Sequence, residues 1–283
     1  MAHRSAHDLG PDDLVLSHFS LERFHPFPDR LDAAAAAGFA GIGLFTGDYL
    51  RLREEGHTPA DLQTMVDDHG LCVAEIEVAR GWGAADPAER ERIEPVLWER
   101  ADTFAPRALQ AIGPRGGTVE EAVTGFGRLC DEAAAHDLAV ALEFLPFTDI
   151  TTLADALTIV EGAARPNGGL CLDLWHLERG SDDRASVADL GAELVITVQM
   201  SGGPAEPVDP GQDYKDDCLR NRRPPGSGDF DAVDFVRRLT ELGVTGPWSV
   251  EVCDERAWGQ PAASHVRNCA DHLRAVLSAA RSG

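Results

Sequence analysis

Short apolar runs alternate with longer segments of helical periodicity along almost the whole chain. Eight runs have the length of buried strands, and each is followed by a segment whose apolar residues recur at helical spacing. The apolar runs are 14–19, 41–45, 72–78, 108–112, 139–144, 169–174, 194–200 and 248–253. The helical segments are 29–37, 58–69, 87–104, 118–136, 152–163, 184–190, 230–242 and 265–279. Strands that alternate with helices predict an α/β fold with a parallel sheet.

Eight strand–helix units of about 30 residues each are typical of a (β/α)8 TIM barrel. A doubly wound open sheet is the alternative, but no G-x-G-x-x-G motif follows the first run, which disfavours a dinucleotide-binding fold. No change of composition marks a linker within the 283 residues. We therefore expect one α/β domain, a single TIM barrel over residues 1–283, with a flexible polar segment over residues 1–13.

The chain is strongly acidic, with 25 Lys and Arg against 48 Asp and Glu and a net charge of −23. This charge repels phosphate backbones and anionic lipid, so we expect neither nucleic acid nor a membrane as a partner. Lys215 is the sole lysine, which disfavours Schiff-base chemistry. The six cysteines form no C-x-x-C pair and no secretion signal is recognisable, so we expect reduced thiols in a cytoplasmic protein.

Polar residues end four consecutive predicted strands. In each strand larger aliphatic residues alternate with smaller ones, so the two sets lie on opposite faces. With the aliphatic set against the helices, the other set faces the barrel axis and ends in Glu143, Asp173, Gln199 and Glu251. Three converging carboxylates repel one another unless a cation lies between them, which predicts Mg²⁺ or Mn²⁺ at the carboxyl end of the barrel. Independent rim carboxylates paired with arginines are the alternative.

Two further residues are expected near this cluster. His176 follows Asp173 by three residues, so a tight turn would place it over the metal, either as a ligand or as a group that binds or protonates substrate. A rim histidine without a role is the alternative. Arg222 lies in the long Pro-, Gly- and Asp-rich stretch 201–228, and an arginine at a catalytic rim suits carboxylate, phosphate or hydroxyl groups of a substrate. A solvated loop with Asp229 as a helix N-cap is the alternative.

Three other residues are expected to contact substrate. His18 ends the first predicted strand, and Glu77 lies on the third. Trp175 belongs to a group of aromatic residues near the rim that indicates a partly apolar pocket. We also expect that the protein can form a homo-oligomer.

The segments around these residues resemble the xylose-isomerase-like barrel superfamily. They are Glu143-Phe-Leu-Pro, Asn167-Gly-Gly-Leu-Cys-Leu-Asp173-Leu-Trp-His176, Val198-Gln199-Met-Ser-Gly, Arg222-Arg-Pro-Pro-Gly-Ser-Gly-Asp229 and Ser249-Val-Glu251. The resemblance extends from about Leu14 to Leu277 and implies a metal held by Glu143, Asp173, Gln199 and Glu251, with His176 near the substrate. Ketose epimerases have histidine at the strand-seven position, whereas Gln199 is similar to some 3-dehydroshikimate dehydratases.

The expected activity is a divalent-metal-dependent isomerase or epimerase of a sugar-, cyclitol- or polyol-ketone, acting through a metal-bound enediolate. Glu143 or Glu251 would remove the proton, and His176 would serve as an acid. Mn²⁺ or Mg²⁺ is the expected cofactor, with Co²⁺ or Zn²⁺ as alternatives. A metal-dependent dehydratase, that is a lyase of the dehydroshikimate or inosose type, is the second hypothesis. A nuclease resembling endonuclease IV and a non-catalytic partner subunit are lesser alternatives, the first disfavoured by the acidic charge.

Overall fold

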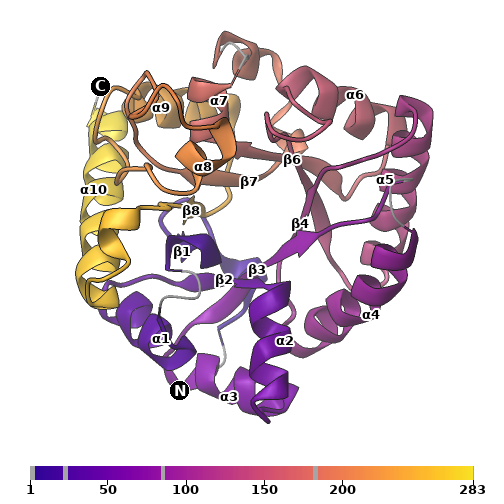
Figure 1. Ribbon diagram of the computed structural model, residues 1–283, viewed down its shortest axis with the longest axis horizontal. Coiled ribbons are helices and arrows are strands. Elements are labelled where there is room, and N and C mark those ends of the chain that lie inside the picture. The colour runs from indigo at the N-terminus through magenta and orange to yellow at the C-terminus, as the bar shows by residue number, and fades with distance from the viewer. Residues whose placement is uncertain (1–3, 22–24, 84–86, 181–183, 283) are drawn as a thin grey trace.

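Eight parallel strands form a closed barrel in sequential order, which confirms the predicted fold (Figure 1). The computed structural model describes residues 4–21, 25–83, 87–180 and 184–282. The strands are β1 (Leu14–Leu16), β2 (Gly41–Phe45), β3 (Cys72–Ala79), β4 (Ala108–Ile112), β5 (Ala139–Glu143), β6 (Gly168–Asp173), β7 (Val195–Met200) and β8 (Trp248–Val250). Pairing of β1 with β8 closes the barrel, so all eight strand ends meet around one axis.

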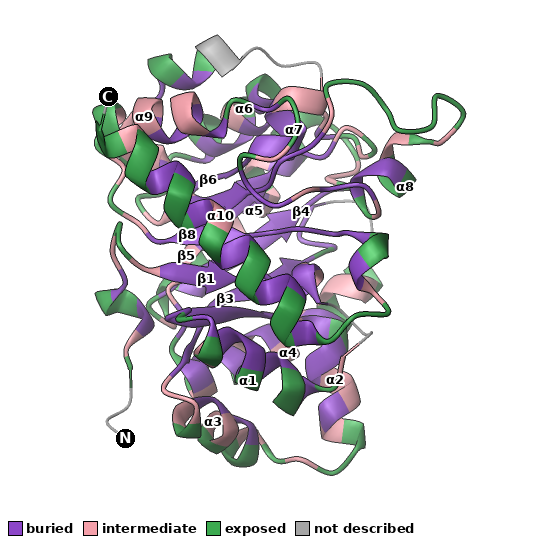
Figure 2. Cartoon of the chain, turned by 90° about the vertical axis from the view of Figure 1, so that its left-hand side faces the viewer, coloured by how far each residue is buried: buried purple, intermediate pink, exposed green. Residues whose placement is uncertain are grey.

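Helices surround the barrel and cover it with their apolar sides (Figure 2). They are α1 (Phe27–Ala36), α2 (Thr46–Glu54), α3 (Pro59–Asp68), α4 (Pro87–Phe104), α5 (Val119–Ala134), α6 (Leu153–Ala163), α7 (Leu174–Arg179), α8 (Tyr214–Cys218), α9 (Ala232–Leu242) and α10 (Ala262–Ser282). Threonine capping boxes at Thr58, Thr118 and Thr152 begin α3, α5 and α6. Among the described helices, none has both the length and the apolar composition needed to cross a membrane.

The predicted division of each strand into two faces holds in the barrel wall. Leu142, Leu172 and Val250 belong to the large apolar core between strands and helices. Cys171 instead contacts Gln199 inside the barrel, and Ser249 donates to Glu75 across it. Polar groups can therefore gather on the axis while the aliphatic face supplies the stability. All six cysteines are unpaired and buried.

Three connections differ from the sequence-based expectation. Two helices, α2 and α3, lie between β2 and β3 where only the second was predicted, because α2 is short and predominantly polar. Residues 184–189 form a 3-10 helix rather than an α-helix. The stretch after β6 turns at once into α7, since the Asp173 side chain accepts a hydrogen bond from the Trp175 N–H and caps that helix.

The amino-terminal segment is packed where the structure describes it. Ala6 and Leu9 are buried in a small cluster with Val15, Cys72 and Ala74. Residues 6–9, which were expected to be flexible, therefore pack against the barrel, and residues 1–3 lie outside the described residues.

The long segment between β7 and α9 is fastened to the barrel by backbone contacts. Gly202 exchanges hydrogen bonds with Arg223 at 2.8 Å, and Gly203 O accepts from Asp229 N at 2.8 Å. Gly228 has a φ of +93°, and a Cβ there would lie 2.3 Å from Gly203 O. Only glycine fits both the left-handed backbone and this close approach.

We expect Gly228→Ala to lower the free energy of unfolding by roughly 2 kcal/mol or more, since it combines left-handed strain with a backbone clash. Gly10→Ala is the control, because a Cβ at Gly10 meets nothing within 4 Å. Urea denaturation of both variants measures the effect. Equal stability of the two variants would contradict the proposed fastening.

Candidate active site and cation site

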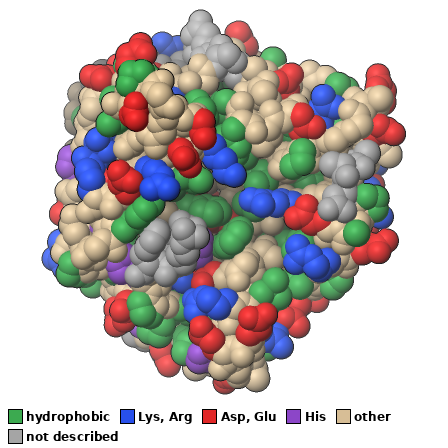
Figure 3. All heavy atoms as spheres, viewed as in Figure 1, with side chains coloured by type: hydrophobic (Ala, Val, Ile, Leu, Met, Phe, Trp, Pro, Cys, Tyr) green, Lys and Arg blue, Asp and Glu red, His purple; other side chains and the backbone are tan. Residues whose placement is uncertain are grey.

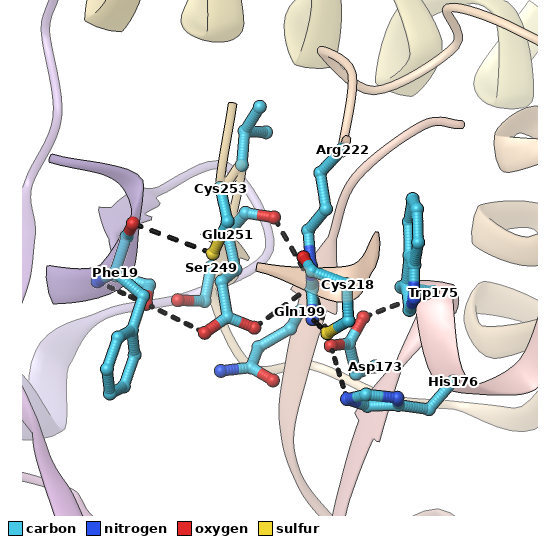
Figure 4. Close-up of polar contacts among 12 residues, drawn as sticks. Phe19, Asp173, Trp175, His176, Gln199, Cys218, Arg222, Ser249, Glu251 and Cys253 are labelled. Carbon is cyan, nitrogen blue, oxygen red and sulfur yellow. Dashed lines mark hydrogen bonds and ion pairs between the residues drawn. The ribbon is translucent and has the colours of Figure 1, made fainter. Parts of the chain in front are cut away.

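Four strands deliver the predicted polar cluster to the carboxyl end of the barrel, and Figure 4 shows three of its members, Asp173, Gln199 and Glu251. Glu143 ends β5, Asp173 ends β6, Gln199 lies in β7, and Glu251 directly follows β8. The pairing of Asp173 with Gln199 places these two at the same height in the barrel wall. Atoms of Glu143, Asp173 and His176 lie within 4.8 Å of one another, a spacing that could hold a metal ion.

The Gln199 amide links the two glutamates. One amide atom lies 3.2 Å from both Glu143 Oε1 and Glu251 Oε2, and the other lies 3.0 Å from Gln110 Nε2. With nitrogen toward the glutamates, the amide donates to both carboxylates. With oxygen there and both carboxylates ionised, three oxygens meet at one point, which is a donor set that fits a hard divalent cation. The side chains present are therefore compatible with an oxygen-coordinated metal.

Arg222 supplies a buried positive charge to this cluster. Its Nη1 lies 2.7 Å from Asp173 Oδ2 and 3.1 Å from Glu251 Oε2. Its Nε donates to Cys218 O at 3.1 Å. Both residues belong to the segment 201–231 between β7 and α9, here called the strap, and this bond fixes the guanidinium against it. The guanidinium is 2% exposed, and the neighbouring carboxylates raise its pKa well above the usual value although burial opposes this. Arg222 is thus a permanent cation of the site.

His176 reaches the cluster from the first turns of α7. Its Nε2 lies 3.5 Å from Glu143 Oε1 and 3.4 Å from Asp173 Oδ2. Its Nδ1 lies 2.9 Å from the hydroxyl of Tyr214, a residue of α8. Burial lowers the pKa of His176 to about 4, so its ring is neutral at physiological pH. A neutral imidazole here could bind a metal or hydrogen-bond a substrate.

The two glutamates hold protons unusually well. Burial, reinforced by Asp173, raises the pKa of Glu143 to about 8. Burial also raises the pKa of Glu251 to about 8, although Arg222 opposes the rise. Groups with such values can both accept and return a proton near neutral pH. A bound cation would favour the ionised carboxylates.

A cavity of about 300 Å³ opens above this cluster. Glu143, His176, Arg222 and Glu251 all line it, so four of the predicted site residues share one space. Apolar side chains form much of the wall, as the sequence suggested: Phe19, Val78, Ile112, Leu145, Phe147 and Leu219. The space-filling view shows a hollow bordered by hydrophobic and basic side chains at this end (Figure 3).

Three predicted substrate contacts lie outside the residues that line this cavity. His18 is buried, and its Nδ1 lies 2.9 Å from Arg30 Nη1. Glu77 is buried in the barrel, where its Oε1 accepts from His18 N at 3.3 Å. Trp175 is buried in the apolar core, with its ring against the guanidinium of Arg222. Their roles in substrate binding stay predictions, and their contacts here are structural.

Two neighbours of the cluster were not anticipated from the sequence. Gln110 on β4 donates to Glu143 Oε2 at 2.9 Å and orients that carboxylate. It is the sole polar residue of β4, a signal that could have indicated an inward position. Tyr214, a residue of the strap, hydrogen-bonds to His176 through its hydroxyl group. The strap has no regular pattern of apolar residues, so this contact has no signal in the sequence.

A closed eight-stranded barrel with titratable carboxyls and a candidate cation site at its carboxyl end is the arrangement of TIM-barrel enzymes, which keep their active sites at that end. Within that class, the chain belongs to the xylose isomerase-like TIM barrel family, whose sequence profile matches residues 31–276.

Relatives within and around this family carry several activities. The chain is 29% identical to a 3-dehydroshikimate dehydratase of Pseudomonas aeruginosa over 266 residues, which are 88% of this chain and 39% of that protein. It therefore spans about two fifths of that relative. It is 25% identical to a 2-oxo-tetronate isomerase of Haemophilus influenzae over 245 residues, covering 78% of this chain and 85% of that protein.

Solved structures reproduce the fold. The IolI protein, crystallised with a bound zinc atom, superposes with a TM-score of 0.83 at 19% identity, over 94% of this chain and 98% of that one. Isomerases and dehydratases both occur among the relatives, so the chain is placed in an enzyme family in which the reaction differs between members.

We expect Glu251→Ala to weaken binding of Mn²⁺ or Mg²⁺ at least about tenfold, since it removes one of the converging carboxylates. Metal content after dialysis in a metal-replete buffer, followed by calorimetric titration, measures the loss. Glu206→Gln removes a carboxylate from an exposed part of the same strap and should bind like the parent. Equal metal binding by Glu251→Ala and the parent would contradict the proposed ligand set.

The environment of His18 predicts a pH dependence of stability. Burial, followed by the charge of Arg30, lowers the pKa of His18 to about 3. Because an unfolded histidine takes up its proton near pH ~6.5, the unfolded state binds more protons as the pH falls from there toward 3, and stability is lost over that window.

In His18→Asn, which keeps an acceptor for Arg30 but does not titrate, we expect a shallower loss, by at most ~1.4 kcal/mol per pH unit. Urea denaturation between pH 7.5 and 5 measures the two slopes. Identical slopes would show that His18 has the same pKa in the folded and unfolded states, which would contradict this prediction.

Proposed function

We propose that the chain is a divalent-metal-dependent isomerase or epimerase of a small hydroxyketone, with Mn²⁺ or Mg²⁺ as the favoured ion. The observation that carries the proposal is that two protonatable glutamates, Glu143 and Glu251, meet at one point, each 3.2 Å from the same atom of the Gln199 amide. Both line the same cavity as His176 and Arg222. Two carboxyls around one reacting carbon are what removal and return of a proton require.

Glu143, Asp173, Gln199 and Glu251 would hold the metal, with His176 next to them. When bound, a divalent ion polarises a carbonyl group and acidifies the neighbouring C–H bond. The chain's own contribution is to hold this oxygen cluster in a buried site, with Arg222 offsetting part of its negative charge. Burial strengthens these electrostatic interactions relative to water.

Glu143 is the proposed base. The Oε2 atom of Glu251 is already engaged by the Arg222 guanidinium at 3.1 Å, which makes it less available to accept a proton from the substrate. Glu143 has a neutral donor, Gln110, on its Oε2 and the neutral His176 near its Oε1. The C–H proton would move to Glu143 and leave an enediolate. Its return to the adjacent carbon isomerises the substrate, and delivery of a proton from Glu251 to the opposite face epimerises it.

Dehydration is the second candidate, favoured by the position of His176. Its Nε2 lies 3.5 Å from Glu143 Oε1, so the proton that Glu143 removes can pass through the imidazole to a departing hydroxyl group. Water then leaves and a C=C bond forms. The similarity to a 3-dehydroshikimate dehydratase supports this candidate.

Proton–deuterium exchange tests the shared first step. Incubation of the metal-loaded protein in D₂O with a panel of ketoses, inososes and dehydroshikimate should label one C–H position of an accepted substrate, as detected by NMR. Glu143→Gln should slow this exchange at least about 100-fold, whereas Glu206→Gln should not. Product analysis then separates isomerisation from water loss. Exchange at the parental rate in Glu143→Gln would refute the assignment of the base.

A further inference from the structure

Two basic side chains line the cavity in addition to Arg222. Arg80 directly follows β3, and Lys215 lies in α8 of the strap after β7. In a barrel of eight strands in sequential order, β3 and β7 lie opposite each other. Arg80 and Lys215 therefore reach the cavity from two segments that follow different strands, and both side chains are exposed at its mouth. Figure 3 shows that basic side chains border the hollow at the centre of this face.

Neither cation is neutralised by the part of the chain that the structure describes. Across residues 4–21, 25–83, 87–180 and 184–282, no carboxylate forms an ion pair with Arg80 or Lys215. Nearby arginines behave differently. Arg179 pairs with Asp217, and Arg220 pairs with Glu255. The chain has a net charge of −23, so two cations without carboxylate partners at one cavity indicate a binding site for a negatively charged group.

Lys215, the sole lysine of the chain, is directed by a neighbouring ring. Its Nζ lies 5.8 Å from the centre of the Phe147 ring, which itself lines the cavity. The interaction of an ammonium group with an aromatic face holds the charge near the cavity without neutralising it. A carboxylate partner would have removed the charge, so this contact preserves the capacity of Lys215 to bind an anion.

The floor of the cavity is formed by the carboxylate cluster and Arg222, and its net charge determines which end of a ligand can bind there. A divalent cation and Arg222 together offset the three carboxylates Glu143, Asp173 and Glu251, so no net positive charge remains there for an anion. The wall between floor and mouth is apolar. A ligand that satisfies all three regions has a hydroxyketone at one end, an apolar middle and a negative charge at the other end.

We propose that this cavity is specific for substrates that carry an anionic group, a carboxylate or a phosphate, which Arg80 and Lys215 bind at the mouth. This inference deepens the proposed function, because it assumes that the reacting ketone lies at the floor. The cations also offset the repulsion that the acidic chain exerts on an approaching anion. Arg80 and Lys215 are thus specificity residues that touch the distal end of the substrate.

Matched ring compounds test the anion site without turnover. Calorimetric titration of the full chain in Mg²⁺ would compare cyclohexanecarboxylate with the isosteric neutral cyclohexanecarboxamide. We expect the carboxylate to bind about tenfold more tightly, with an affinity that falls as salt is added. Cyclohexyl phosphate in the same titration distinguishes the two anions, and the tighter ligand identifies the preferred group.

Charge-removing variants locate the site. Arg80→Gln and Lys215→Gln should each weaken binding of the preferred anion by roughly three- to tenfold and leave the carboxamide unchanged. Arg267→Gln is the control, since it removes one positive charge from an exposed position on α10, outside the cavity lining. It should bind all three probes like the parent.

Three results would overturn the inference. They are equal binding of anions and carboxamide, an equal loss in Arg267→Gln, and anion binding that disappears on removal of Mg²⁺ but is indifferent to Arg80→Gln and Lys215→Gln. The last would mean that the probe binds the metal. Because these titrations need no catalysis, selective anion binding without any deuterium exchange would reject the proposed reaction while supporting the anion site.

Discussion

The mutual repulsion of Glu143, Asp173 and Glu251 is the constraint on which the rest of this site depends. Burial alone would drive protons onto these carboxyls, and burial does raise the pKa of Glu143 and Glu251 to about 8. Arg222 supplies a fixed positive charge against two of them, at 2.7 Å from Asp173 and 3.1 Å from Glu251. A divalent cation among the same oxygens would complete the compensation, and the Gln199 amide can face it with oxygen.

The barrel separates the stability of the fold from the chemistry of the site. Aliphatic residues on the outer faces of the strands form the apolar core with the helices, so the inner face is free to carry polar groups. The strap between β7 and α9 then contributes what the strands cannot. It brings Arg222 to the carboxylates, Tyr214 to His176 and Lys215 to the cavity mouth, and its attachment depends on the glycine contact at Gly228.

Positive charge is distributed unevenly in an otherwise acidic molecule. Arg222 is paired with carboxylates inside the site, whereas Arg80 and Lys215 at the cavity mouth have no carboxylate partner among the described residues. This arrangement gives the cavity a polar floor, an apolar wall and a basic entrance. Such an order suits a substrate with distinct ends better than a uniformly hydroxylated sugar. It also provides a physical means by which members of one family could select different substrates on a shared floor.

The sequence by itself determined the eight-fold alternation of strands and helices and the inward register that ends in Glu143, Asp173, Gln199 and Glu251, because periodicity reports which face of a strand each residue occupies. It also indicated Arg222 and His176. Tertiary structure alone decided which side chains meet across the axis and in the loops. Gln110 and Tyr214 contact the cluster and Arg80 and Lys215 line the cavity, whereas His18, Glu77 and Trp175 are buried and are not among the residues that line it. Such contacts depend on strand stagger and on the path of an irregular strap, and local periodicity encodes neither.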